Sequence, residues 1–184
     1  MQDERVLVER ARQKDSDAFA VLYENYFDKI YRYVAFKTGN RTEAEDMTQQ
    51  VFLNAFESIS SFKWRNVPFS AWLFRIAHNK IVDYLRKKGR RGTMATSVED
   101  ISVVADSDPQ AEAELTLDIE WLGEATGNLT EAQREVITLR FAGDLPIAQV
   151  AQIMGKSQGA VKALQHSAIV ALRKAMPEGG PKNE

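Results

Sequence analysis

The sequence predicts an all-α fold of two small helical domains joined by a flexible acidic linker. Apolar residues recur at steps of three and four along most of the chain, without the two-residue alternation that strands show. Glycines and prolines divide these stretches into segments of helix length. Residues 92–109 are rich in Ser, Thr, Asp and small side chains and lack this periodicity, as expected of a linker. We therefore place the domains at residues 1–91 and 110–177 and a disordered tail at 178–184.

The first predicted helix carries a broad apolar stripe from Phe19 to Val34, and either Asp15 or Ser16 is suited to cap its first turn. Residues 38–41 end it. The next helix is expected to open at Thr42, because Thr42 and Glu45 have capping-box spacing. Its inner face is formed by Ala44, Met47, Val51 and Ala55, and its outer face offers Asp46, Gln49, Gln50 and Asn54.

A loop over 58–68 then leads to a predicted helix from about Phe69 to Lys88. This helix mixes aromatic residues with cations, a combination that binds single-stranded nucleic acid when the aromatic rings are exposed. The alternative is that Trp72 and Tyr84, which fall at helical spacing, belong to the core. Aromatic residues in the preceding loop are expected to be exposed for a purpose.

After the linker, Leu115, Ile119 and Leu122 suggest another helix, and Thr130 with Gln133 repeats the capping-box spacing. The stretch from Pro146 to about Met176 then has the pattern of a helix-turn-helix. Ala151 is the small residue where the two helices cross, and Gly155 is the glycine of the turn. Ser157 is suited to cap the second helix, and the branched apolar side chain of Val161 holds that helix against the first.

Side chains on the outer face of the second helix are expected to meet base edges or phosphates in a major groove. They are Gln158, Ala160, Lys162, Gln165, His166 and Arg173. An ordinary pair of packed helices with a glycine turn is the alternative to this interpretation.

Composition excludes several classes of function. The chain has no cysteine, which rules out disulfides and thiol catalysis. It has only two histidines, so we expect no metal, and we expect no cofactor. No apolar run approaches the roughly 20 residues that cross a bilayer, so we expect a cytoplasmic protein without membrane insertion. The net charge is −2, which is unusual for a protein that binds DNA alone. Cations crowd the segment from Arg75 to Arg91, whereas Glu99–Glu124 holds acidic residues and no Lys or Arg.

Four separated blocks of the chain, taken with the helix-turn-helix, closely resemble the extracytoplasmic-function (ECF) group of bacterial sigma factors. The blocks are Asp-Ala-Phe at 17–19, Ala-Glu-Asp-Met-Thr-Gln-Gln-Val-Phe at 44–52, Phe-Ser-Ala-Trp-Leu-Phe-Arg-Ile-Ala-His-Asn at 69–79 and Leu-Thr-Glu-Ala-Gln-Arg-Glu-Val at 129–136. They occur in the family's order, with the helix-turn-helix last.

The resemblance implies that the N-terminal domain is sigma-2-like, docks on core RNA polymerase and opens the minus-10 promoter element. It places polymerase contacts at Asp46, Gln49 and Gln50. The loop before the cationic helix would cup a flipped base, and the helix would hold the melting strand. The minus-10 residues are then Phe62, Lys63, Trp64, Arg65, Asn66, Arg75, Asn79, Lys80 and Arg86.

By the same resemblance the C-terminal domain is sigma-4-like and recognises minus-35 duplex DNA. Its contacts would be Ser157, Gln158, Lys162, Gln165 and His166, where many relatives carry several arginines. The acidic linker resembles the segment that threads through the polymerase interior, although its charge alone equally fits a solvated spacer. An anti-sigma factor is the usual regulator in this family.

Two other classes compete with this interpretation. A stand-alone helix-turn-helix regulator would bind an operator without polymerase, but it leaves the first ~90 residues without a role. An enzyme would need an acid and a base, for which Glu45 with Asp46, or His78 near Asp83, are the candidates. Adjacent residues on a helix point in different directions, and His78 has no nucleophile or metal cluster beside it in the sequence, so the enzyme is disfavoured.

Overall fold

The computed structural model describes residues 3–64, 67–90 and 126–175, and within these ranges it contains helices and no strand, which confirms the all-α class. The N-terminal half consists of α1 (Glu4–Arg12), α2 (Ser16–Thr38), α3 (Arg41–Ser58), the 3-10 turn η1 (Ile59–Ser61) and α4 (Phe69–Arg90). The C-terminal half consists of η2 (Thr126–Asn128), α6 (Glu131–Ile137), the π-helical turn η3 (Thr138–Ala142), α7 (Ile147–Met154) and α8 (Gln158–Ala175).

Helix α1 was not predicted, although the sequence carries the signals for it. The Asp3 side chain caps the helix by accepting a hydrogen bond from the Arg5 N–H at 3.0 Å. Leu7, Val8 and Ala11 are buried against the rest of the N-terminal half, on one face of the helix. Charged residues cover the outer face of α1, so its short apolar stripe is not apparent from the composition of this segment.

Helix α2 begins and ends as the sequence predicts. Asp15 Oδ1 accepts hydrogen bonds from the N–H groups of Asp17 and Ala18, both at 3.1 Å. The Ala18 bond contributes most to lowering the pKa of Asp15, followed by the hydrogen bond from Arg10. Gly39 ends the helix at a positive φ of 63°, a conformation that favours glycine.

The predicted capping box of α3 is wrong. The helix begins at Arg41, and the N-cap is Asn40, whose Oδ1 accepts a hydrogen bond from the Glu43 N–H at 3.0 Å. Asn is as good an N-cap as Thr, and its extended backbone directly follows the left-handed Gly39, so the chain turns two residues earlier than expected. The predicted inner face is confirmed, because Ala44, Met47, Val51 and Ala55 are all buried.

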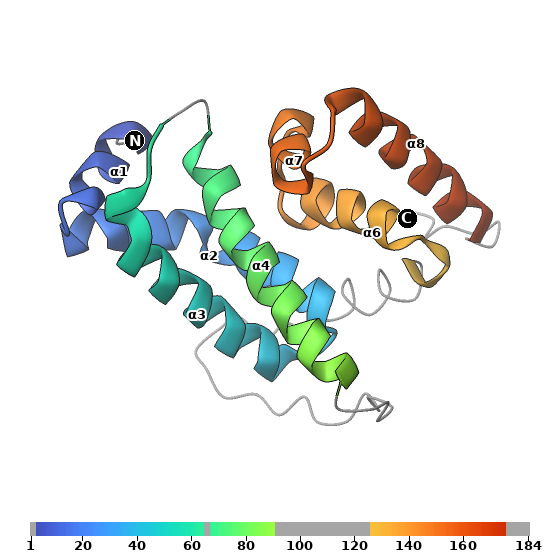
Figure 1. The fold of residues 1–184 in the computed structure, drawn as a ribbon, viewed down its shortest axis with the longest axis horizontal. Coiled ribbons are helices and arrows are strands. Elements are labelled where there is room, and N and C mark those ends of the chain that lie inside the picture. The colour runs from blue at the N-terminus through green and yellow to red at the C-terminus, as the bar shows by residue number, and fades with distance from the viewer. Residues whose placement is uncertain (1–2, 65–66, 91–125, 176–184) are drawn as a thin grey trace, which may run out of the picture.

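In the C-terminal half, the capping box of Thr130 and Gln133 is confirmed at the start of α6. Helices α7 and α8 form the predicted helix-turn-helix (Figure 1). The linker at 92–109 and the helix expected around Leu115, Ile119 and Leu122 lie outside the described residues.

The two halves pack directly on each other. Helix α4 crosses in front of α2 and lies between α3 and the C-terminal half in Figure 1. Both α4 and α2 contact that half, α4 through α7 and α2 through η3. One apolar core therefore continues from the N-terminal helices into α6, η3 and α7. A second, smaller cluster of Leu129, Ile137 and Ala168 joins α8 to the start of its own half.

Candidate nucleic-acid interface

The turn between α7 and α8 has the geometry that a helix-turn-helix requires. Gly155 lies at a φ of 63° and its N–H donates to the Ala151 carbonyl. Ser157 Oγ then accepts a hydrogen bond from the Ala160 N–H at 3.2 Å, which caps the first turn of α8. Val161 is fully buried and Ala151 nearly so, which confirms the predicted packing between the two helices.

The outer face of α8 is largely open to solvent. Ser157, Gln158, Lys162, His166 and Arg173 are exposed. Gln165 is half-buried instead of outward, because its side-chain oxygen accepts a hydrogen bond from Arg140 Nε at 3.2 Å. Its amide is therefore positioned from within its own half, at the edge of the exposed face.

The outer face of α3 is a second exposed polar surface. Asp46, Gln49 and Gln50 are exposed on the side opposite the buried stripe of this helix. Leu53, which follows one turn after Gln49 and Gln50, is 57% exposed. Sequence analysis missed Leu53, although its spacing of three and four from the two glutamines places it on the same face. An exposed leucine beside short polar groups suits a protein partner better than a nucleic acid.

The loop before α4 departs from expectation. Phe62 is 3% exposed and its ring lies 5.2 Å from the rings of Trp64 and Trp72, so the predicted exposure of this aromatic residue is wrong. Trp64 is half-buried, with the Arg5 guanidinium 5.8 Å from its ring centre. The unpredicted helix α1 supplies this cover. Lys63 is exposed, and Arg65 and Asn66 lie outside the described residues.

The predicted minus-10 residues of α4 divide into two groups. Asn79 and Arg86 are exposed, and Arg86 lies 3.7 Å from Asp83 on the same helix. Lys80 is half-buried, with its Nζ 3.3 Å from the Asn54 side-chain amide. Arg75 donates a hydrogen bond to the Gln152 carbonyl at 2.8 Å and so joins α4 to α7.

A buried polar cluster that sequence analysis missed connects the two halves. Glu135 on α6 is 5% exposed, and its Oε1 accepts a hydrogen bond from Tyr33 at 2.7 Å. His78 Nδ1 lies 3.1 Å from the same oxygen, and Lys37 forms an ion pair with Oε2. His78, considered above as a candidate acid or base, is therefore a partner of Glu135. No signal in the sequence pairs these residues, because 57 to 102 positions separate Glu135 from its partners.

The electrostatics of this cluster keep Glu135 charged. Burial alone would raise its pKa, but the hydrogen bond from His78, the charge and hydrogen bond of Lys37, and the hydrogen bond from Tyr33 outweigh burial and lower the pKa to about 2. Burial first, and then the nearby Glu135 carboxylate, raise the pKa of Tyr33. The Tyr33 hydroxyl therefore stays protonated and able to donate.

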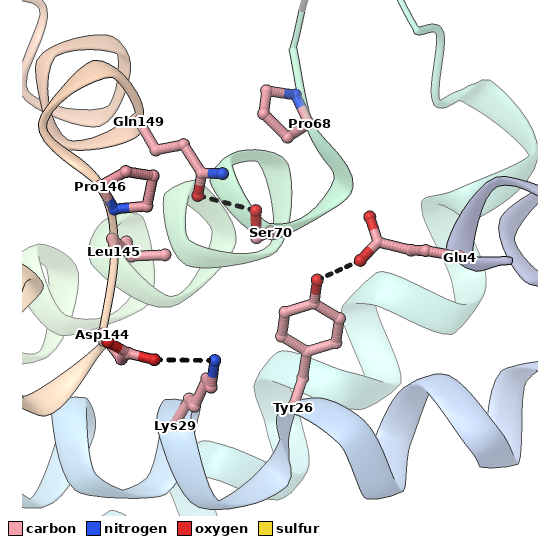
Figure 2. Close-up of a pocket in the computed structure, with 9 residues that line it drawn as sticks. All are labelled: Glu4, Tyr26, Lys29, Pro68, Ser70, Asp144, Leu145, Pro146 and Gln149. Atoms are coloured by element: carbon pink, nitrogen blue, oxygen red, sulfur yellow. Dashed lines mark hydrogen bonds and ion pairs between the residues drawn. The ribbon is translucent and has the colours of Figure 1, made fainter. Parts of the chain in front are cut away.

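A shallow pocket of about 210 Å³ lies where the halves meet (Figure 2). Three polar pairs line it: Tyr26 with Glu4 at 2.5 Å, Lys29 with Asp144 at 3.3 Å and Ser70 with Gln149 at 2.8 Å. These groups satisfy one another, so the pocket is better explained as the edge of the contact between the halves than as a ligand site. Within the described residues, no cluster of three potential metal ligands occurs. None of the helices described is long and apolar enough to span a membrane.

Four helices packed beside a helix-turn-helix with an exposed outer face define a two-domain, all-helical protein of the DNA-binding class. The family models described as Sigma-70 region 2 and Sigma-70, region 4 match residues 22–91 and 127–174. The chain belongs to the ECF sigma factors of the sigma-70 family.

Its relatives include two named ECF RNA polymerase sigma factors. SigW of Bacillus subtilis is 32% identical over 181 residues, which cover 92% of this chain and 94% of SigW. BldN of Streptomyces coelicolor is 35% identical over 172 residues, covering 94% of this chain and 65% of BldN. The chain thus spans about two thirds of the length of BldN.

Solved structures show the same fold. CnrH, solved in complex with the cytosolic domain of CnrY, is 24% identical with a TM-score of 0.69 over 93% of this chain and 95% of that chain. RpoE of Bartonella quintana, solved with the anti-sigma factor NepR, is 23% identical with a TM-score of 0.66 over 85% of this chain and 95% of that chain.

Proposed function

We propose that this chain is an alternative sigma factor that binds core RNA polymerase and directs initiation from one class of promoter through the minus-10 and minus-35 elements. The observation that carries the proposal is the match to both sigma-70 regions, in order, in one all-helical chain. Sigma factors are initiation factors, and we propose that the chain has no enzymatic activity of its own and acts in the cytoplasm.

The C-terminal half supplies the minus-35 contact in this proposal. Its exposed recognition face carries hydrogen-bonding side chains at Ser157, Gln158 and His166 and a cation at Lys162. Gln165, oriented by Arg140, contributes from the edge. Because few cations lie on this face, it anchors the chain weakly by itself and works beside polymerase.

The N-terminal half supplies the minus-10 contact. Exposed Lys63, Asn79 and Arg86 are available to the DNA backbone, and Arg65 and Asn66 remain predicted contacts. In this proposal Phe62 supports the loop and does not touch DNA itself, because its ring is buried. Trp64, packed on Phe62 and beneath Arg5, presents only part of its ring to a base. Arg75 and Lys80 become available when their present contacts are released.

The outer face of α3 supplies the polymerase contact. Asp46, Gln49 and Gln50 provide hydrogen-bonding groups, and the exposed Leu53 adds apolar area at the centre of a protein interface. The domain limits of 1–91 and 110–177, with a linker at 92–109, remain our proposal for how these functions divide along the chain. A regulator of the anti-sigma type also remains a proposal.

A co-purification experiment tests the proposal against a stand-alone regulator. The full chain is incubated with core RNA polymerase and separated by size exclusion, and its affinity for promoter DNA is measured with and without polymerase. We expect a stable complex with polymerase and weak DNA binding without it. Tight operator binding with no polymerase association would establish the stand-alone regulator instead.

A further inference from the structure

We propose that helix α1 is part of the minus-10 site, and that Arg5 on this helix is a positioning residue that fixes the ring of Trp64. This inference rests on the proposed sigma function and adds a helix to its minus-10 site. The family model of Sigma-70 region 2 begins its match at residue 22, so it assigns no role to α1, which spans Glu4–Arg12.

Helix α1 is docked on the N-terminal half beside the loop that holds Trp64. It contacts η1, the turn directly before this loop. The Tyr26 hydroxyl of α2 donates a hydrogen bond of 2.5 Å to Glu4, the residue before Arg5 (Figure 2). On the inner face of α1 the buried apolar side chains are Leu7, Val8 and Ala11. The backbone of Arg5 is therefore held in one place next to the loop.

The side chain of Arg5 has a different kind of partner from the two other arginines of α1. Each of those forms an ion pair at 2.8 Å with a carboxylate, and the pairs are Arg10 with Asp15 and Arg12 with Glu9. The guanidinium of Arg5 instead lies over the ring of Trp64, 5.8 Å from the ring centre. This is a cation–π contact, in which the face of an indole ring attracts a cation. The ring thus orients the cation, and the cation in turn restrains the ring.

Trp64 lacks the polar anchor that a buried indole ordinarily has. The N–H of a buried tryptophan usually finds an acceptor, and that hydrogen bond fixes the rotation of the ring. Trp64 Nε1 is buried and has no hydrogen-bond partner within the described part of the chain. The ring packs on Phe62, with 5.2 Å between the centres and 74° between the planes. Its orientation therefore depends on its contacts with Phe62 and Arg5.

A restrained ring favours binding of the melted strand. Trp64 is half-buried, and the exposed part of an aromatic ring can stack on an unpaired base. A side chain that is ordered only when DNA binds lowers the affinity, whereas a ring already held in place avoids this loss. Arg5 prepares the loop in this way before DNA arrives.

A direct contact between Arg5 and a DNA phosphate is the alternative, because Arg5 is exposed. The two roles differ in what they change. A phosphate contact releases a counter-ion and contributes to the salt dependence of binding, whereas a positioning residue acts through Trp64. The place of the guanidinium over the ring and the unpaired indole N–H favour positioning.

Fluorine NMR of the free chain tests the contact itself. The chain is labelled with 5-fluorotryptophan at its three tryptophans, and Trp64→Phe identifies the Trp64 signal by its loss. We expect Arg5→Gln to shift or broaden this signal, because the ring loses one of its two restraints. Arg12→Gln, which removes a cation from the same helix, is the matched control and should leave the signal unchanged. A Trp64 signal that is unaffected by Arg5→Gln would overturn the inference.

Binding of single-stranded DNA tests the consequence for function. The holoenzyme of core polymerase and the full chain is titrated with an oligonucleotide that carries the minus-10 sequence of a start site mapped with this chain. We expect Arg5→Gln to weaken this binding about threefold or more, while the affinities for core polymerase and for a minus-35 duplex stay the same. Arg12→Gln should change none of the three affinities. An equal loss of all three with Arg5→Gln would indicate damage to the fold and contradict a positioning role.

A double-mutant cycle with Trp64→Leu separates positioning from a phosphate contact. Leucine keeps an apolar side chain against Phe62 but offers no ring to a cation. If Arg5 acts through Trp64, Arg5→Gln has no further effect in the Trp64→Leu chain, and it leaves the salt dependence of binding unchanged. Additive effects, or a salt slope reduced by about one counter-ion, would establish a phosphate contact in place of the positioning role.

The proposed function and this inference fail in different ways. If the parent chain forms no complex with core polymerase, the sigma function is wrong, and the fluorine spectrum of the free chain still decides whether Arg5 restrains Trp64. If the Arg5→Gln holoenzyme binds the oligonucleotide as tightly as the parent holoenzyme, the positioning role is wrong and the sigma function stands.

Discussion

The carboxylate of Glu135 illustrates how one charged residue acquires its role from tertiary contacts. In the folded chain its pKa is lowered to about 2, against an ordinary value of 4.5. A depressed carboxylate pKa means that the charged form is stabilised by folding. The contribution is fully present above pH 4.5 and is lost as the pH falls toward 2.

We therefore predict that Glu135→Gln lowers the free energy of unfolding by about 3 kcal/mol at pH 7 and by progressively less below pH 4.5. Tyr33, Lys37 and His78 are the groups that face Glu135 from the other half. Urea unfolding of both chains between pH 7 and pH 3 measures the difference. A difference that stays constant over this range would refute the assigned pKa.

Lys162 is the exposed cation of the predicted minus-35 contacts. We predict that Lys162→Ala weakens binding of the polymerase holoenzyme to the minus-35 element and reduces the salt dependence of binding by about one counter-ion. Lys87→Ala, which removes an exposed cation from α4, serves as the control in a minus-35 fluorescence-anisotropy assay. Equal effects of the two substitutions would remove Lys162 from the contact list.

At the scale of the element, the helix-turn-helix depends on one backbone conformation. Gly155 has a positive φ, whereas a Cβ on Gly159 would meet little except Ser157 Oγ at 3.9 Å. We predict that Gly155→Ala lowers the free energy of unfolding by about 1 kcal/mol, while Gly159→Ala is neutral or stabilising. Thermal unfolding of the two variants separates these effects, and equal melting temperatures would contradict the prediction.

Signals confined to a few residues explain which elements could be predicted. The Asp15 cap, the Thr130–Gln133 capping box and the Gly155 turn are local, and all three are confirmed. The predicted start of α3 is too late because two cap candidates, Asn40 and Thr42, lie two positions apart. Only the backbone after Gly39 decides between them.

The candidate site was predictable only in part, for a related reason. Sequence periodicity indicates which face of α3 or α8 is exposed, so Asp46, Gln49 and Lys162 could be placed on the surface. It does not indicate what covers a loop. Phe62 is buried by its neighbouring rings, and Arg5 from α1 lies over Trp64.

At the scale of the whole molecule, the packing of the two halves was beyond the reach of sequence patterns. Lys29 contacts Asp144, a residue 115 positions away, and nothing periodic connects them. An acidic linker predicts independent domains as readily as docked ones. The docked arrangement joins the halves through charges as well as through apolar packing.

Transcription in vitro with mapped start sites tests the central claim most directly. Core RNA polymerase is combined with fragmented genomic DNA, with and without the full chain, and the 5′ ends of the transcripts are sequenced. The account predicts new start sites that appear only with the chain and share one pair of minus-10 and minus-35 sequences. An unchanged set of start sites, with a chain that is folded and binds DNA without polymerase, would contradict it.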